Sequence, residues 1–257
     1  MFLILDESVI LFVFAAVFGL LWGSFLNVVA FRLAFDLPFW RPRSHCPQCD
    51  RQLRWFELLP LVSWIFLRGR CRTCKASISW LYPTLELLGG ISFGLLFITF
   101  PLRFIPFLAV FISALLVSLR TDIEQLVIFR YCTLFLIPLA WLGAWFNLLP
   151  LSLTFSLIGT VLGYGILWSV RFLSQLITGR IGMGLGDAEM LAMIGAFLGP
   201  FGLWSSLFIA SCIGSLIGVF MLIQGKATRT TPLPFGAFLA LGGLISLFLA
   251  VPLTTLF

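Results

Sequence analysis

The sequence has very little charge. Only 10% of its 257 residues are Asp, Glu, Lys or Arg, against about a quarter in a typical soluble domain. There are ten acidic residues and one histidine in a chain that is 61% hydrophobic. This deficit excludes a soluble globular enzyme, a disordered chain and a nucleic-acid reader. Uncharged runs long enough to cross a bilayer indicate a polytopic membrane protein.

The sequence also lacks an internal repeat, a low-complexity tract and a linker long enough to free a second membrane domain. The missing inverted repeat argues against the architecture of many secondary transporters. Near the N-terminus, Asp6 and Glu7 stand where a cleavable signal peptide would have basic residues. We therefore expect the first apolar run to remain as a helix, within one membrane bundle.

The uncharged runs predict an all-α membrane protein with about eight transmembrane helices. They cover residues 9–31, 87–102, 104–119, 131–170, 190–225 and 230–257. Two runs are long enough for two crossings each, with breaks at 147–150 and at Gly199-Pro200. We expect three regions: a first transmembrane helix at 1–34, an insert at 35–84 and a seven-helix membrane bundle at 85–257.

Basic residues gather on one side of this topology. The insert contains Arg41, Arg43, Arg51, Arg54, Arg68, Arg70, Arg72 and Lys75. The same side receives Arg32, Arg120, Arg171, Arg180, Lys226 and Arg229, whereas the opposite side receives only Arg103. Because Lys and Arg are enriched in cytoplasmic loops, we expect a multi-pass protein of the cytoplasmic (inner) membrane, with the insert in the cytoplasm and both termini outside.

Four cysteines give the insert its clearest motif. Cys46-Pro-Gln-Cys49 is followed, 21 residues later, by Cys71-Arg-Thr-Cys74. Two Cys-x-x-Cys pairs at this spacing predict a zinc-ribbon-like site in which four thiolates hold one structural Zn²⁺. The alternative is a pair of redox motifs activated by nearby Arg and Lys, which cytoplasmic placement disfavours. His45, the only histidine, is expected to be a bystander.

Two acidic pairs lie between the later helices, Asp122 with Glu124 and Asp187 with Glu189. A carboxylate at the end of a membrane helix is costly, which suggests a function. Asp187 ends the segment Gly182-Met183-Gly184-Leu185-Gly186-Asp187, in which glycines such as Gly184 and Gly186 allow a substrate strand to approach the backbone. We expect Asp122 to begin the fourth helix and Asp187 the sixth, so that both face each other at the cytoplasmic side.

Two facing carboxylates predict aspartic protease chemistry. When they share one proton, one can activate water while the other protonates a carbonyl. The alternative for each aspartate is a helix N-cap or a partner of the helix dipole. The glycine segment is not a dinucleotide-binding loop, because no strand precedes it.

Taken together, these motifs resemble the type IV prepilin peptidases, also called leader peptidases and N-methyltransferases, which are membrane aspartyl proteases of the Gly-x-Gly-Asp kind. The similarity covers nearly the whole chain. It includes Gly23-Ser24-Phe25-Leu26-Asn27-Val28-Val29 with Arg32, both cysteine pairs, Leu59-Pro60-Leu61-Val62-Ser63-Trp64, Arg68-Gly69-Arg70-Cys71, Ile78-Ser79, Tyr82-Pro83, Glu86-Leu87, the glycine segment and Pro234-Phe235-Gly236.

The resemblance implies that Asp122 and Asp187 are catalytic. It implies prepilin or pseudopilin substrates, cut after a glycine at the cytoplasmic face of the bilayer, in type IV pilus or type II secretion systems. It also implies methylation of the new N-terminus from S-adenosylmethionine, with Gly23, Asn27 and Glu57 as candidates. Their structural alternatives are close helix packing, a bond across helices and an Arg pair, respectively.

Two positions depart from the family pattern. Phe129-Arg130 stands where the family usually has Pro-Asp, and Glu189 stands where it has a lysine. If the two side chains meet, the exchange of charges is a compensating swap; otherwise it indicates a changed pH optimum, changed substrate choice or loss of one activity. The alternatives are therefore a peptidase without methyltransferase activity, a catalytically silent pilus-assembly subunit, or a transporter or channel with intramembrane carboxylates.

Overall fold

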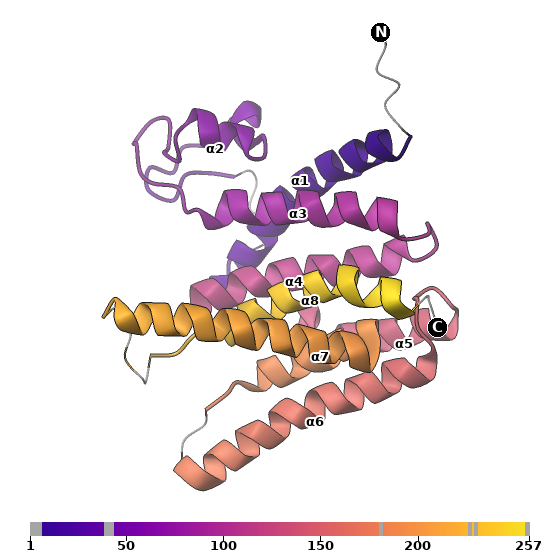
Figure 1. Cartoon of the computed structure of the whole chain (residues 1–257). Helices are drawn as coiled ribbons and strands as arrows, with labels where there is room; N and C mark the ends of the chain where they lie inside the picture. The colour runs from indigo at the N-terminus through magenta and orange to yellow at the C-terminus, as the bar shows by residue number, and fades with distance from the viewer. Residues whose placement is uncertain (1–6, 39–43, 180–181, 226–227, 229–230, 255–257) are drawn as a thin grey trace. The chain divides into compact units, whose positions relative to one another are not determined.

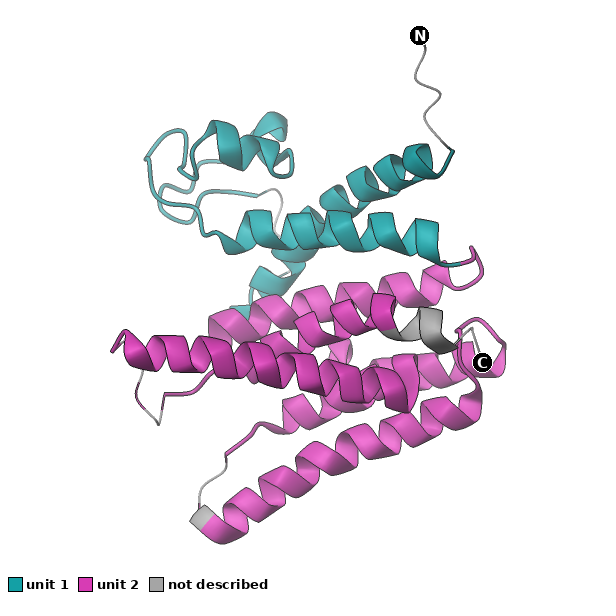
Figure 2. Ribbon diagram, viewed as in Figure 1, with its two compact units in different colours: residues 1–100 teal, residues 101–257 magenta. Residues whose placement is uncertain are grey.

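A computed structural model describes residues 7–38, 44–179, 182–225, 228 and 231–254. These residues contain helices and no strand, and the chain forms two compact units, residues 1–100 and 101–257 (Figures 1 and 2). The predicted all-α class is confirmed. Five of the basic residues used to orient the chain, Arg41, Arg43, Arg180, Lys226 and Arg229, lie outside the described residues. The finer division at 34 and 84 remains a prediction.

Unit 1 consists of two long helices with the insert between them. Helix α1 spans Glu7–Ala34 and α3 spans Leu81–Thr99, with η1 (Trp55–Leu58) and α2 (Val62–Phe66) in the insert. The long helices pack against each other through glycines: a Cβ added to Gly19 would collide with the carbonyl oxygen of Gly89. Small residues allow membrane helices to approach this closely.

Unit 2 contains the remaining helices. They are α4 (Ile105–Gln125), η2 (Arg130–Cys132), η3 (Leu134–Leu136), α5 (Ile137–Trp145), α6 (Leu153–Thr178), α7 (Leu185–Ile223) and α8 (Phe235–Thr254). Helix α7 packs against both α6 and α8, and α4 packs against α8. Gly159 of α6 faces Gly195 of α7 so closely that a Cβ on either would collide with the other's backbone. The first part of α7 is almost completely buried.

Both predicted breaks are present. Helix α7 is interrupted at Gly199, whose φ of 70° and ψ of −175° are not helical, and Pro200 follows. Its 39 residues would extend about 58 Å as one straight helix, nearly twice the thickness of a bilayer core, so the break divides it into two arms. The other break lies between α5 and α6, where Asn147 has a positive φ of 53°.

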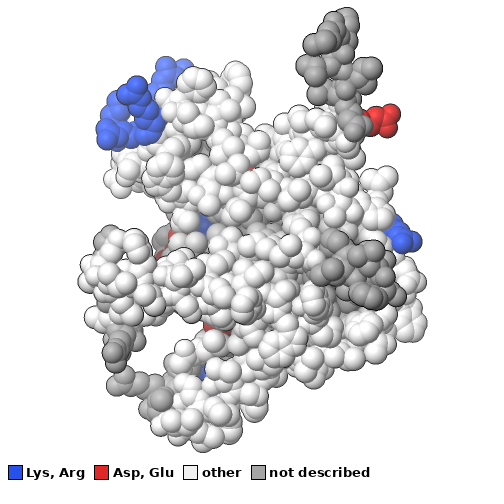
Figure 3. Space-filling view, in the orientation of Figure 1, with Lys and Arg blue, Asp and Glu red and all other residues white. Residues whose placement is uncertain are grey.

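Five helices in the described part of the chain are long and apolar enough to cross a membrane: α1, α3, α4, α6 and α7. Helix α8 contributes a shorter apolar segment over residues 235–249. Counting the two arms of α7 separately and including α5 gives the eight helical segments expected from the sequence; that all of them cross remains a prediction. The face shown in Figure 3 is largely uncharged, and the basic side chains visible on it gather mainly over the insert of unit 1.

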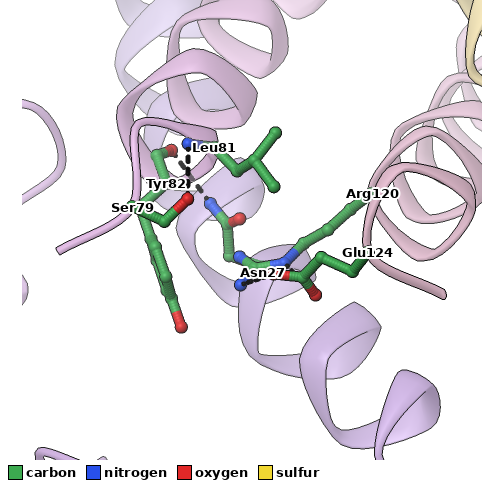
Figure 4. A network of polar contacts seen from close by, with 6 residues as sticks. All are labelled: Asn27, Ser79, Leu81, Tyr82, Arg120 and Glu124. Atoms are coloured by element: carbon green, nitrogen blue, oxygen red, sulfur yellow. Dashed lines mark hydrogen bonds and ion pairs between the residues drawn. The ribbon is translucent and has the colours of Figure 1, made fainter. Parts of the chain in front are cut away.

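The expected position of Asp122 is wrong in one respect. It lies in the last turn of α4, the third long helix, instead of at the start of the fourth. The helix continues through this charged segment because Arg120 and Glu124, one turn apart, form an ion pair of 3.1 Å (Figure 4). It ends at Leu126, which has the left-handed conformation typical of helix C-termini.

Candidate active site and metal site

The Asp122 carboxylate lies where the end of α4 meets the start of α8. It is buried, and its Oδ2 accepts a hydrogen bond of 2.8 Å from the Ala237 backbone N–H. The Gly236 amide also faces this carboxylate. The first turn of α8 therefore provides backbone donors to an acid 115 residues earlier in the chain. The positive end of the helix dipole favours a negative charge at this position.

Asp187 has an equivalent environment at the start of α7. It is buried in the first turn, and its side chain turns back toward Gly184, the N-cap residue, whose amide faces the carboxylate. The lack of a side chain at Gly184 leaves this approach open, since a Cβ there would lie 3.3 Å from Asp187 Oδ2. An acidic residue at this position satisfies a free amide of the helix end.

The Ile128 side chain lies beside both aspartate sites. A Cβ on Gly186, next to Asp187, would lie 3.0 Å from Ile128 Cβ. A Cβ on Gly236 would overlap Ile128 Cδ1 and lie 3.0 Å from Asp122 Oδ2. Both glycines therefore contact one isoleucine, and the two carboxylates are close enough for their like charges to interact. The ends of α4, α7 and α8 converge here.

Arg130 and Glu189, the two positions that depart from the family pattern, are in contact. Arg130 Nε donates a hydrogen bond of 3.1 Å to Glu189 Oε1. The Arg130 side chain is 64% exposed, whereas the Glu189 side chain is only 8% exposed. The condition for a compensating swap is met. The pair joins η2 to the turn of α7 that contains Asp187.

The four cysteines of the insert form one cluster. Their Sγ atoms all lie within 4.8 Å of one another, and those of Cys46 and Cys74 are 3.8 Å apart. A tetrahedral zinc ion with Zn–S bonds of about 2.3 Å requires sulfurs about 3.8 Å apart. The donor set and its spacing therefore fit Zn²⁺. His45 is not in this cluster; its Nε2 lies 3.9 Å from Asp50 Oδ1, in agreement with a bystander.

The two cysteine pairs have matching backbone structures, offset by 25 positions. Cys46 accepts a bond from the Asp50 amide at 2.9 Å, and Cys71 accepts one from the Lys75 amide at 3.1 Å. Asp50 and Lys75 both have a positive φ, which turns the chain back after each pair. The amides of Cys74 and Thr73 lower the pKa of the Cys71 thiol to about 6. The second turn thus favours the thiolate form of Cys71, which is the form that binds a metal.

Gly23 and Asn27 contribute to the packing of α1 on α3. A Cβ on Gly23 would lie 3.0 Å from the Leu85 carbonyl oxygen. Asn27 Nδ2 donates to the Tyr82 carbonyl oxygen at 3.1 Å, in the first turn of α3 (Figure 4). The same turn is capped by the Ser79 hydroxyl, which accepts the Leu81 amide. Both structural alternatives are therefore present in the molecule.

Glu57 is a buried acid held within the insert. It accepts hydrogen bonds from Arg51 Nη2 at 2.6 Å and from the Arg54 amide at 2.8 Å. The bond from Arg51 and, to a lesser extent, the bond from the Arg54 amide lower the pKa of Glu57. The structural alternative for Glu57, a pair with an arginine, is therefore present, and Arg51 also faces the Cys71 sulfur. Glu57 thus supports the chain next to the cysteine cluster.

Sequence reasoning assigned no role to three residues that the geometry makes important. Ile128 lies between the aspartate sites, Gly236 leaves room for Asp122, and Glu86 of α3 accepts the Leu61 amide at 2.8 Å. Ile128 has no sequence signal, because isoleucine is common in any apolar run. Gly236 and Glu86 both belong to motifs that carry the family resemblance, Pro234-Phe235-Gly236 and Glu86-Leu87, and an acid inside an apolar helix is itself a signal.

Two family models match the chain. Residues 17–100 match the bacterial peptidase A24 N-terminal domain, and residues 109–219 match the type IV leader peptidase family. The prepilin leader peptidase/N-methyltransferase of Stutzerimonas stutzeri is 39% identical over 259 residues, covering 91% of this chain and 89% of the relative.

Similar relatives occur in other bacteria. The prepilin leader peptidase/N-methyltransferase of Aeromonas hydrophila is 36% identical, over 90% of this chain and 88% of its own length. An Escherichia coli protein, the type 4 prepilin-like proteins leader peptide-processing enzyme, is 32% identical over 92% of this chain and 93% of its own length. No solved structure matches the chain.

Proposed function

Because the chain belongs to the type IV leader peptidase family, we propose that it is a membrane aspartyl endopeptidase that processes prepilins or pseudopilins. The substrate has a short leader outside the bilayer and an apolar stem within it. The bond after a glycine at the membrane surface is cleaved. A site built at the ends of three membrane helices suits a substrate that enters from the bilayer.

Asp122 and Asp187 divide the work of hydrolysis. One carboxylate accepts a proton from water, whose oxygen attacks the carbonyl carbon of the scissile peptide. The other, protonated at that stage, donates its proton to the carbonyl oxygen. Collapse of the tetrahedral intermediate then breaks the C–N bond, and a proton moves to the leaving amine. The backbone donors from Gly184, Gly236 and Ala237 hold each carboxylate in position.

The observation that carries this proposal is the convergence of the two aspartates on Ile128. The acids are 65 positions apart in the chain, yet the glycine beside each one contacts the same side chain. Helix capping alone explains either aspartate, but it does not require two capping sites to adjoin. An aspartic protease dyad does require it.

Methylation of the new N-terminal residue follows cleavage, with S-adenosylmethionine as donor. The names of the relatives support this second activity. Gly23, Asn27 and Glu57 are the candidates in this chain. Because each has a structural contact, a methylation role needs a variant that still cleaves: Asn27→Ala with normal cleavage and no methyl group would assign Asn27 to this step.

The cysteine cluster holds a structural Zn²⁺ through Cys46, Cys49, Cys71 and Cys74. The ion would tie the two ends of the insert together and supply no reactive group. The protein resides in the cytoplasmic membrane, with the insert and the aspartate site on the cytoplasmic side and both termini outside. Basic residues of the insert support this orientation.

Mass spectrometry of a prepilin incubated with the purified protein and S-adenosylmethionine tests both activities. We expect loss of the leader and gain of one methyl group. Asp122→Asn and Asp187→Asn should each lower the rate of cleavage by about 10²-fold to 10⁴-fold, while the protein remains folded and inserted. Glu124→Gln is the control, since its amide oxygen can still accept the Arg120 bond.

Each alternative gives a different spectrum. Leader loss without methylation would identify a peptidase only. An unchanged prepilin, with a folded protein and a substrate that a related enzyme cuts, would favour the silent assembly subunit. Cleavage by either aspartate variant at the wild-type rate would remove that residue from the mechanism.

A further inference from the structure

Among the described residues of unit 1, several large apolar side chains of the insert and its end are exposed. Trp55 of η1 and Phe66 of α2 are 76% and 83% exposed, and Ile65 beside Phe66 is also exposed. Trp80, at the start of α3, is 71% exposed and lies against Trp64, with ring centroids 4.1 Å apart. A cluster of this kind on a small folded module indicates a binding surface.

The position of α2 along α3 indicates the depth of this face. The Leu61 amide, just before α2, donates to Glu86 of α3 at 2.8 Å. Glu86 is the sixth residue of α3, with its Cα about 7.5 Å along that helix from the first residue, so α2 begins beside the first two turns of α3. Figure 1 shows α2 beside the first turns of α3.

The length of α3 then places the start of α2 in the interfacial region of the membrane. Its 19 residues extend only about 28 Å, roughly the thickness of the hydrocarbon core. A helix this short needs its whole length to cross, so its second turn cannot lie in bulk water. The start of α2 is therefore at the depth where interfacial helices bury their apolar side chains, about 5–10 Å below the surface.

The charges of the insert complement an anionic leaflet. Between residues 44 and 80, the exposed basic side chains are Arg54, Arg68, Arg70, Arg72 and Lys75, and the exposed acid is Asp50. The remaining acid there, Glu57, is buried and paired with Arg51. Trp and Tyr are enriched at membrane interfaces, and Lys and Arg next to them bind anionic headgroups.

We propose that η1, α2 and Trp80 form a membrane-anchoring face, which inserts into the anionic leaflet at which α3 begins. The anchoring segment lies between two turns that contain the cysteine pairs, and backbone bonds close both turns: the Leu53 amide donates to the Ser44 carbonyl oxygen, and the Ile78 amide donates to the Gly69 carbonyl oxygen. The insert is thus a module held flat on the bilayer. This inference depends on the membrane-spanning character of α3 and not on the catalytic proposal.

Photo-crosslinking tests it in the full-length protein. Phe66 is replaced by p-benzoylphenylalanine, and Gln52, an exposed residue three positions after the first cysteine pair, is replaced in a matched control. Each protein is irradiated in nanodiscs that contain phosphatidylglycerol or only phosphatidylcholine, and adducts are identified by mass spectrometry. We expect lipid adducts at position 66, with a severalfold higher yield in phosphatidylglycerol, and few at position 52.

The other outcomes contradict the proposal. Adducts from position 66 to a second protein chain would assign the face to a protein partner. Equal lipid yields at positions 66 and 52 would show that the face is not anchored. Equal yields in the two lipids would refute the electrostatic contribution. Prepilin cleavage is measured on the same samples, so failure of the anchor is distinguished from failure of the catalytic site.

Discussion

Arg130 Nε lies 3.1 Å from Glu189 Oε1, and this contact ties η2 to the helical turn that contains Asp187. The resemblance implies an acid near position 130 and a lysine at 189, and in this chain both charges are the opposite. A reversal at one position alone would have left two like charges next to a buried carboxylate. The two departures therefore place opposite charges in contact, as a compensating swap requires.

Reversing one charge of this pair should lower activity, and reversing both should restore it. Arg130→Glu leaves the buried Glu189 without its partner and adds repulsion, and a mostly buried unpaired charge costs about 1–3 kcal/mol. We expect about a tenfold or larger fall in kcat/KM for Arg130→Glu and for Glu189→Arg separately. The double variant should recover most of the activity, which a prepilin cleavage assay measures.

Arg103→Glu provides the control for this cycle, because Arg103 is exposed and lies on the Phe104 ring in the loop before α4. It should cleave at nearly the wild-type rate. If the single and double variants lose activity additively, the two side chains do not act as a pair, and the departures from the family pattern would then indicate a change in activity.

Gly236 should not tolerate a methyl group. In Gly236→Ala the new Cβ would overlap Ile128 Cδ1 and press on the Asp122 carboxylate, 3.0 Å away. A displacement of about 1 Å in a catalytic group can cost roughly 10²-fold in rate, so we expect a fall of that order in kcat. Gly165→Ala, whose Cβ would meet nothing within 4 Å, is the matched control. Equal activities would exclude a tight fit around Asp122.

Much of the fold was accessible from the sequence because bilayer crossing imposes length and composition on each helix. The breaks at Gly199-Pro200 and at 147–150 were predicted because each contains a proline, next to a glycine or after an asparagine, and these residues favour the end of a helix. The end of α4 was not, since Arg120, Asp122 and Glu124 suggested a surface segment. In the structure the i,i+4 pair of Arg120 with Glu124 keeps these charges inside the helix. A local pattern of charge does not distinguish a loop from a paired helical turn.

The candidate site was predictable in its acids and cysteines, but not in what surrounds them. Asp187 and the cysteine pairs belong to short motifs whose spacing reflects their chemistry. Ile128 acquires its importance only through contacts with Gly186 and Gly236, which are distant in sequence from it. Such contacts depend on how α4, α7 and α8 converge, and no single segment contains that information.

Loss of one cysteine should release the metal without affecting the aspartates directly. Cys46→Ser removes one of four thiolates from a cluster that has no other ligand group among the described residues. We expect about one zinc per chain in the wild type and a large fall in the variant, measured by elemental analysis of the purified protein. Cys212→Ser, which changes an exposed free cysteine in α7, should retain the metal. Equal zinc contents in Cys46→Ser and wild type would refute the site.

Lowering the pH should destabilise the folded insert, and part of this loss should depend on Glu57. Its pKa in the folded protein is lowered, chiefly by the Arg51 hydrogen bond, so the ionised form stabilises the insert. This stabilisation is fully present above the ordinary value for glutamate, about 4.3, and is lost as the pH falls through the lowered folded value.

Pepsin digestion of the membrane-reconstituted protein can follow this loss, because pepsin is active in acid. Between about pH 5 and pH 2 the wild-type insert should become progressively more susceptible to cleavage. Glu57→Gln lacks the charge at every pH. Its insert should therefore already be more susceptible to pepsin than the wild-type insert at about pH 5, and its susceptibility should rise less as the pH falls. Protonation of the cysteine thiolates affects both proteins alike, and the difference between the two profiles isolates Glu57. Parallel profiles would show that the Arg51–Glu57 pair does not stabilise the insert.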